Sequence, residues 1–165
     1  MNEFDLIRRY FDRPAADPAV RLAVGDDAAI LAPTPGHELL VSTDMLVCGR
    51  HFFADVDPRA LGHKALAVNL SDIAAMGGTA RWATLAAAWP ELDADWLAAF
   101  AEGWFALADA HEVALIGGDT TRGPLTLSVS IFGEAPAGRA LRRDGGRAGD
   151  DVWVSGELGM AAAAV

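Results

Sequence analysis

Residues 82–89 read WATLAAAW, and this run contains almost no polar side chain. We predict a strand over Arg81–Trp89, ended by Pro90, because a continuous apolar run bounded by a turn residue is typical of a buried strand. A strand that is apolar on both sides needs a covering layer on each face of its sheet. Helices can supply one of these layers, and a second subunit is the simplest candidate for the other.

Two long helices flank this strand in the chain. Asp57 and Pro58 are a favoured N-cap and first helical residue, and two glycines after Met76 end the helix that they begin. The second helix is expected over residues 93–111, where apolar residues form a stripe at helical spacing. Each apolar stripe must be buried against another element, so we expect both helices to pack on one face of the sheet.

Shorter patterns predict the remaining elements. A helix is expected over residues 3–12, and strands over Ala28–Ala32, Glu38–Thr43, Val113–Ile116 and Leu125–Phe132. GDDVWVSG, at 149–156, predicts a last strand, and the start of a helix follows at 158–165. This order indicates an α+β sandwich, with two long helices on one face of a mostly antiparallel four-stranded sheet. We expect residues 1–150 to form one domain and residues 151–165 to begin a second.

The composition excludes several classes of protein. Apolar residues make up 52% of the 165 residues, which is enough for a buried core, and charges interrupt every apolar run before the length of a membrane span. The net charge of −10 argues against binding to nucleic acid or anionic membranes. The N-terminus does not resemble a signal peptide, and the single cysteine, Cys48, suits a reducing interior. We therefore expect a cytoplasmic protein.

One aspartate stands out because it falls inside a predicted helix. Asp72 shares a helix face with Asn69 among apolar residues, where a carboxylate needs a partner or a cation. A salt bridge to Lys64 or Arg81 is the alternative to a cation. The other aspartates next to glycine or hydroxyl residues could each be an ordinary turn residue.

Together these residues offer only oxygen ligands, namely carboxylates from Asp27, Asp44, Asp72 and Asp119 and hydroxyls from Ser42, Thr43, Thr120 and Thr121. Oxygen donors suit Mg²⁺, Mn²⁺ or Ca²⁺, and the chain has neither a zinc motif nor EF-hand spacing. Carboxylates repel phosphates by about 4 kcal/mol per pair at ~4 Å and an effective dielectric of ~20, so a phosphate site here would need bridging metals. Walker A and protein-kinase motifs are absent from the sequence.

Five segments follow one another along the chain: VGDDAAIL, VSTDMLVCGRHF, NLSDIAAMG, LIGGDTTRGPLTLSV and GRALRRDGGRAGDDVWVSGELG. Together they resemble the thiamine-monophosphate kinase family. The resemblance implies a homodimer in which two four-stranded sheets close into a barrel. It also implies transfer of the ATP γ-phosphate to thiamine monophosphate, with several Mg²⁺ ions. Family members are about twice as long, so we expect this chain to be their N-terminal half and to be inactive alone.

The resemblance also assigns roles to individual residues. The implied Mg²⁺ ligands are Asp27, Ser42, Thr43, Asp44, Asp72 and Asp119, of which Asp44, Asp72 and Asp119 serve catalysis. Gly118, Asp119 and Arg143 are implied to meet the ATP phosphates, and His51 the thiamine phosphate. Met160 and Cys48 depart from the residues usual in the family, although neither is an implied ligand.

Two other functions remain open from the sequence. The chain could be a non-catalytic module that binds magnesium-nucleotide and dimerises. It could also belong to a sister enzyme of the superfamily that includes aminoimidazole ribonucleotide synthetase, with ATP used to activate another substrate. Binding of ATP with and without Mg²⁺, a panel of substrates and the sequence beyond Val165 would separate these possibilities.

Overall fold

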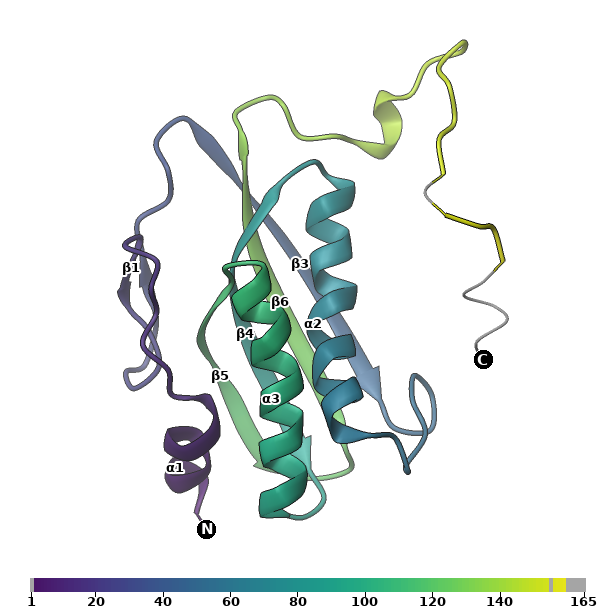
Figure 1. Cartoon of the computed structure of the whole chain (residues 1–165). Coiled ribbons are helices and arrows are strands. Elements are labelled where there is room, and N and C mark those ends of the chain that lie inside the picture. Colours follow the sequence, from purple (N-terminus) through teal and green to yellow (C-terminus); the bar gives the residue numbers. More distant parts are fainter. Residues whose placement is uncertain (1, 155, 160–165) are drawn as a thin grey trace.

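The structure, a computed structural model, describes residues 2–154 and 156–159. Its centre is a four-stranded sheet in the order β3-β6-β4-β5 (Figure 1). These strands span His37–Val47 (β3), Thr126–Pro136 (β6), Thr79–Trp89 (β4) and Ala114–Arg122 (β5). β6 pairs antiparallel with β3 and β4, whereas β4 and β5 are parallel. The sheet is therefore mixed, with two antiparallel pairs out of three. The predicted α+β class with a four-stranded sheet and two packed helices is confirmed, and closure into a dimeric barrel stays a prediction.

The two long helices begin and end within two residues of their predicted bounds. α2 spans Pro58–Ala75, and the carboxylate of Asp57 accepts a hydrogen bond from the N–H of Ala60. α3 spans Ala94–Ala110, and Asp93 caps it in the same way. Side-chain acceptors satisfy backbone donors that have no partner within the helix, which is why these caps mark the helix starts in the sequence.

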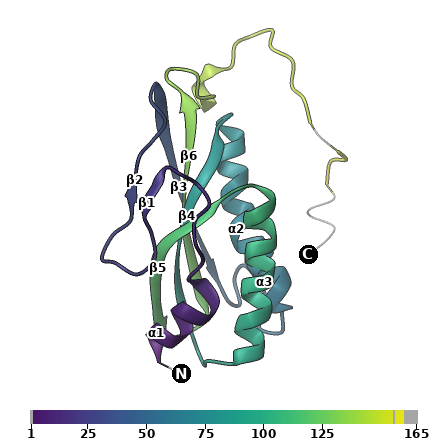
Figure 2. The same ribbon diagram turned by 60° about the vertical axis from the view of Figure 1, so that its left-hand side comes forward.

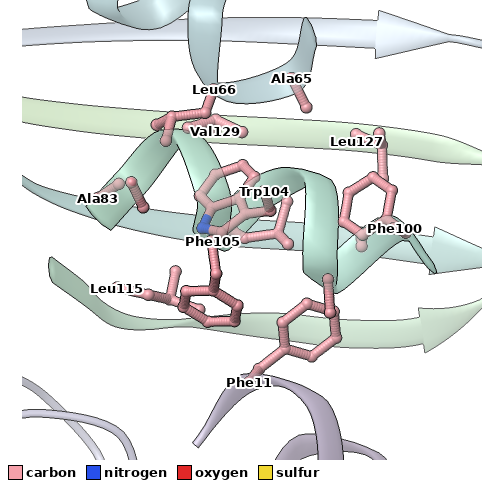
Figure 3. Packing of buried hydrophobic residues seen from close by; sticks show 14 of the residues in the cluster. Phe11, Ala65, Leu66, Ala83, Phe100, Trp104, Phe105, Leu115, Leu127 and Val129 are labelled. Atoms are coloured by element: carbon pink, nitrogen blue, oxygen red, sulfur yellow. The ribbon is translucent and has the colours of Figure 1, made fainter. Parts of the chain in front are cut away.

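Both long helices lie on the same face of the sheet (Figures 1 and 2). They bury alternate residues of the strands, such as Leu127, Val129 and Ile131 in β6, against Phe100 and Trp104 of α3. Figure 3 shows these two aromatic side chains between the helix and the strands. The alternation follows from the pleat of a strand, whose successive side chains point to opposite faces.

The opposite face of the sheet carries an unpartnered apolar row along β3. Leu39, Val41 and Met45 are 46%, 58% and 57% exposed, and they alternate with residues that face the helices. A row of large apolar side chains in water is uncommon on a monomeric protein. This face is the one for which the sequence predicted a second cover.

The N-terminal region is more irregular than expected. The predicted helix over 3–12 consists of a four-residue α-helix, α1 (Glu3–Leu6), and a π-helical turn, η1 (Ile7–Phe11). A separate two-stranded sheet follows, formed by β1 (Val20–Leu22) and β2 (Ile30–Leu31). The sequence did not predict β1. The strand predicted over Ala28–Ala32 starts two residues before β2 and ends one residue after it. Strands this short show no clear alternation of apolar and polar residues.

All four strands of the central sheet are longer than predicted, and in β3 and β5 this changes the setting of an aspartate. β3 and β5 continue past Thr43 and Ile116, so Asp44 and Asp119 lie inside strands and not after them. The ends of both strands were predicted at the point where polar residues and glycines replace the apolar run. β3 and β5 are the two edges of the sheet, where polar side chains are compatible with a strand.

The prediction of a strand over 149–156 is wrong for the residues that the structure describes. Residues 151–154 form no strand, and Val152 and Trp153 are 93% and 88% exposed. A strand needs a partner edge, and this segment lies away from the sheet after a short 3₁₀ turn, η2 (Arg143–Gly145) (Figure 1). The predicted helix at 158–165 lies mostly outside the described residues, and the division into two domains stays a prediction.

Candidate functional site

One group of polar side chains joins the β3 edge to α2. Ser42 donates a hydrogen bond from Oγ to Asp72 Oδ2 at 2.5 Å, and the N–H of Asp44 donates to Asn69 Oδ1 at 3.2 Å. Asn69 is fully buried, and its amide also donates to the carbonyl of Ala65 at 3.0 Å. A buried amide with both ends bonded is a rigid support, so Asn69 holds β3 and α2 in register. Ser42, Asp44 and Asp72 therefore gather at one place.

The salt bridge considered for Asp72 is not what the structure contains. Lys64 donates from Nζ to the carbonyl of His51 at 2.7 Å, and Arg81 pairs with Asp17 and Glu134. Within the described part of the chain, Asp72 takes part in no ion pair. Its bonded neighbour is the hydroxyl of Ser42, which leaves the other carboxylate oxygen available to a cation.

Thr43 does not join this group. It lies on the opposite face of the strand from its neighbours, and its Oγ1 is 2.8 Å from Ser130 Oγ of β6. The alternation of side chains along a strand makes this separation unavoidable for consecutive residues. In the sequence the triplet at 42–44 looked like a single cluster of ligands.

A second group lies at the β5 edge, around a cavity of about 780 Å³. The cavity lies between the N-terminal helical residues, the segment 23–29 and β5, and Asp27, Gly118 and Asp119 all line it. The close approach of β5 to β4 requires glycine at position 118. Its φ is +149°, and a Cβ atom there would lie 1.9 Å from the carbonyl oxygen of Leu85.

The two groups are at opposite edges of the sheet. The pairing register places Asp44 beside Val129, Val129 beside Leu85, and Leu85 beside Gly118. Three strand spacings separate Asp44 from Gly118, or about 14 Å. Oxygen ligands lie ~2.1 Å from Mg²⁺, so Asp44 and Asp119 of one chain cannot share an ion. Consistently, in residues 2–154 and 156–159 no three acidic, histidine or cysteine side chains are arranged to hold a metal.

His51 and Arg143 stand apart from both groups. His51 lies in the loop after β3, where Nδ1 accepts a hydrogen bond from the N–H of Val47 at 3.0 Å. A nitrogen that accepts cannot carry the proton, so the neutral ring carries it on Nε2. Arg143 is exposed in η2 and does not line the cavity at the β5 edge.

A buried ionic network, which the sequence did not predict, ties the N-terminal segment to the sheet. Arg81 bonds Asp17 Oδ2 and Glu134 Oε2, each at 2.8 Å. Glu134 also accepts from the N–H and hydroxyl of Thr34, and Asp17 from the indole of Trp82. The only sequence signal was an arginine at the start of an apolar strand.

This network shifts the acidity of both carboxyls. Burial by itself raises the pKa of Asp17, but the N–H of Ala19 and the guanidinium of Arg81 outweigh it and bring the pKa below its usual 3.8. Burial likewise opposes the shift at Glu134, where bonds from Thr34 and the charge of Arg81 bring the pKa below its usual 4.5. Both carboxyls are held in their charged form.

Comparison with known proteins agrees with this architecture. Residues 25–135 match the family described as AIR synthase related protein, N-terminal domain. This chain belongs to that family. None of the helices that the structure describes is long and apolar enough to cross a membrane.

Within the family, the chain is a homologue of the N-terminal half of thiamine-monophosphate kinases. It is 51% identical to the Salmonella typhimurium enzyme over 98% of its own length, and it spans about half of that relative, 50%. The crystal structure of thiamine-monophosphate kinase from Stenotrophomonas maltophilia superimposes with a TM-score of 0.88 at 52% identity, covering 99% of this chain and 52% of that one. The structure of AaThiL complexed with AMPPCP and TMP gives 0.65 at 31% identity, over 87% of this chain and 44% of that one. The resemblance identified from the sequence is confirmed.

Proposed function

We propose that the full-length protein carrying this chain transfers the γ-phosphate of ATP to thiamine monophosphate, giving thiamine diphosphate and ADP. The main support is identity near 50% with thiamine-monophosphate kinases along almost the whole chain. The complex of a similar protein with AMPPCP and TMP supports the same pair of ligands. A cytoplasmic location is part of this proposal.

The reaction joins two anions, so the protein has to neutralise charge and align them. The acceptor is a phosphate oxygen that is largely ionised at neutral pH, since its second pKa is ~6, and it therefore needs no general base. His51 presents a donor, Nε2–H, that suits the acceptor phosphate. Arg143 would supply a fork-shaped contact to the nucleotide. In-line alignment and charge stabilisation account for most of the catalysis in phosphoryl transfer.

The donor groups at both sheet edges fit Mg²⁺, because they consist of carboxylate and hydroxyl oxygens. Asp27 and Asp119 would hold magnesium at the β5 edge, and Ser42, Asp44 and Asp72 at the β3 edge, whereas Thr43 lies on the opposite face of β3. Bound Mg²⁺ would supply neutralisation of the phosphate charges. The side chains of this chain bind and orient the ions, and Asn69 keeps the β3 group in place.

A homodimer would bring the two edges together. If the β3 edge of one copy pairs with the β5 edge of another, two four-stranded sheets close into an eight-stranded barrel. The barrel would cover the exposed row of Leu39, Val41 and Met45 and would place Asp44 beside the partner's Asp119. The ~14 Å separation within one chain supports this arrangement.

The proposed function is tested by thiamine diphosphate formation in the full-length protein. Asp44→Asn and Asp119→Asn should each lower turnover about 100-fold or more at saturating Mg²⁺, because each removes charge that holds a bridging ion. Asp109→Asn is a matched control, since this exposed carboxylate has only a 3.4 Å contact with Arg13. Near-normal turnover in Asp44→Asn and Asp119→Asn would refute the metal assignment, and no turnover in the wild type would refute the function.

A further inference from the structure

Two side-chain hydrogen bonds join α2 to β3, which lie beside each other in Figure 1. Asn69 of α2 accepts one of them from the N–H of Asp44. About one helical turn further on, Asp72 accepts the other from the hydroxyl of Ser42. The bonded residues are ~4.5 Å apart along the helix and ~6.8 Å apart along the strand. Elements joined at two separate points can neither slide nor pivot against each other, so these bonds fix the relative positions of the carboxylates that the two elements carry.

Asn69 is the one member of this connection that the proposed metal site does not use. Its side chain is fully buried, whereas Asp44 is half-buried and Asp72 is exposed. The amide accepts from Asp44 at 3.2 Å and donates to the carbonyl of Ala65 at 3.0 Å. A buried amide costs free energy unless it is bonded in this way. An apolar side chain of similar size could fill the same space without polar atoms to satisfy, so packing alone does not require asparagine here.

We propose that Asn69 is a positioning residue of the magnesium site at the β3 edge. By holding the N–H of Asp44 against α2, it sets where the carboxylate of Asp44 lies relative to that of Asp72. This inference rests on the proposed function, to which it adds a residue that touches neither metal nor substrate. Mg²⁺ requires nearly ideal octahedral geometry at ~2.0–2.1 Å, so a small displacement of one carboxylate weakens binding. Substitution of residues that orient metal ligands typically costs about 10–100-fold in metal affinity or activity.

Two substitutions separate the bond to β3 from the bond within the helix. In Asn69→Thr, the hydroxyl can donate to the carbonyl of Ala65, four residues earlier, but the shorter side chain does not reach Asp44. Asn69→Leu keeps the size of the side chain and loses both bonds. Tyr10→Phe is the matched control, because it removes a hydrogen bond of 3.1 Å from a buried side chain to the carbonyl of Ala94, away from the β3 edge.

Binding of Mn²⁺ to the full-length protein provides a readout that does not depend on turnover. Electron paramagnetic resonance measures the free ion, and Asp72→Asn identifies which bound ions belong to the β3 edge. We expect both Asn69 variants to bind these ions about tenfold more weakly, and Tyr10→Phe to bind them as the wild type does. Thermal unfolding of every variant is measured first, and binding is compared at a temperature at which all of them are folded.

Kinetics provides a second readout, since Asn69→Thr retains every oxygen ligand of the site. We expect this variant to need about tenfold more Mg²⁺ for half-maximal formation of thiamine diphosphate, while its KM for thiamine monophosphate at saturating Mg²⁺ stays near the wild-type value. A role in stability alone would change the thermal midpoint and leave the Mg²⁺ requirement unchanged.

Three results would overturn the role of Asn69. They are an unchanged Mn²⁺ affinity in both Asn69 variants, an equal loss in Tyr10→Phe, and a Mn²⁺ titration that Asp72→Asn does not alter. If the wild type forms thiamine diphosphate in any of these cases, the proposed function stands without this inference. If the wild type shows no turnover, the proposed function fails, and the Mn²⁺ titrations still decide whether Asn69 positions the site.

Discussion

His51 illustrates how one backbone contact decides the chemistry of a side chain. Because Val47 N–H donates to Nδ1, the neutral ring can offer only Nε2–H to a ligand. Lys64 holds the same loop through the carbonyl of His51. The ring is thus presented as a hydrogen-bond donor, which suits an anionic acceptor.

Two substitutions at His51 separate its two nitrogen atoms. Gln can place its amide N–H₂ near the position of Nε2, whereas the shorter Asn can place its carbonyl oxygen near Nδ1 but its N–H₂ does not reach the position of Nε2. We expect His51→Asn to raise the KM for thiamine monophosphate about tenfold or more, the scale of a hydrogen bond to a charged group, and His51→Gln to raise it much less. Steady-state kinetics on the full-length protein measures both. A larger KM in the Gln variant than in the Asn variant would contradict a donor role.

Two buried tryptophans allow a measurement of how much an indole hydrogen bond contributes to the free energy of unfolding. Among the residues that the structure describes, Trp104 Nε1 is the buried side-chain polar atom without a partner, whereas Trp89 Nε1 donates to Thr120. We expect Trp89→Phe to lower the free energy of unfolding by about 1 kcal/mol more than Trp104→Phe does, because only Trp89 loses a bond. Urea unfolding of both variants measures this difference. An equal or larger loss for Trp104→Phe would disprove it.

At the scale of the elements, the two long helices depend on a close crossing. Gly103 of α3 lies against the backbone of α2, and a Cβ atom there would be 1.9 Å from the carbonyl oxygen of Arg59. Gly62 of α2 makes the reciprocal approach to Phe100, at 2.1 Å. Neither contact leaves room for a methyl group, so the crossing requires glycine on both helices.

A methyl group at this crossing should force the helices apart. We expect Gly103→Ala to lower the free energy of unfolding by about 2–3 kcal/mol, which is the scale of overpacking in a core. Gly145→Ala is the control, because nothing lies within 4 Å of its Cβ position. Thermal and urea unfolding of the two variants provide the comparison. A Gly103→Ala protein as stable as its control would show that the crossing can relax.

The same elements show what the sequence can predict. The bounds of α2 and α3 were predictable because their capping aspartates lie next to strongly apolar stretches. The extent of β5 was not, because Gly117 to Arg122 look like a loop until β4 is known to pair with them. Residue identities predicted which carboxylates could be metal ligands. Their division between two sheet edges follows from strand order, which no local pattern contains.

At the scale of the whole molecule, Arg81 connects segments that are far apart in the sequence. It bonds Asp17 before β1 and Glu134 near the end of β6. Folding lowers the pKa of both carboxyls, so both stabilise the folded state at a pH above the pKa that they have in the unfolded chain. This contribution is lost as the pH falls through the lower pKa of the folded state. We therefore expect the thermal midpoint to decrease below a pH of about 4, and to vary little from this cause near neutrality.

Removing Arg81 tests this dependence. Arg81→Met leaves two mostly buried carboxylates without their cation, so we expect a loss of about 3 kcal/mol at pH 7. The loss should be smaller near pH 4, where the carboxyls accept protons. Unfolding measured across this pH range checks both expectations. A variant whose deficit stays constant with pH would rule out the ionic origin of the effect.

The distance between the sheet edges makes a prediction about the dimer. If each site combines Asp44 of one chain with Asp119 of its partner, two inactive variants can restore each other. A mixed dimer of Asp44→Asn and Asp119→Asn chains has one site with both residues intact and one site with neither. If the site lies within a single chain, every site of the mixed dimer stays damaged.

The most direct measurement is therefore thiamine diphosphate formation by the full-length Asp44→Asn and Asp119→Asn proteins, alone and after co-expression. Random assembly makes half of the dimers mixed, each with one intact site out of two. We predict that the co-expressed protein recovers about a quarter of the wild-type rate, while each variant alone stays nearly inactive. A co-expressed sample no more active than its parents would contradict a site shared between two copies.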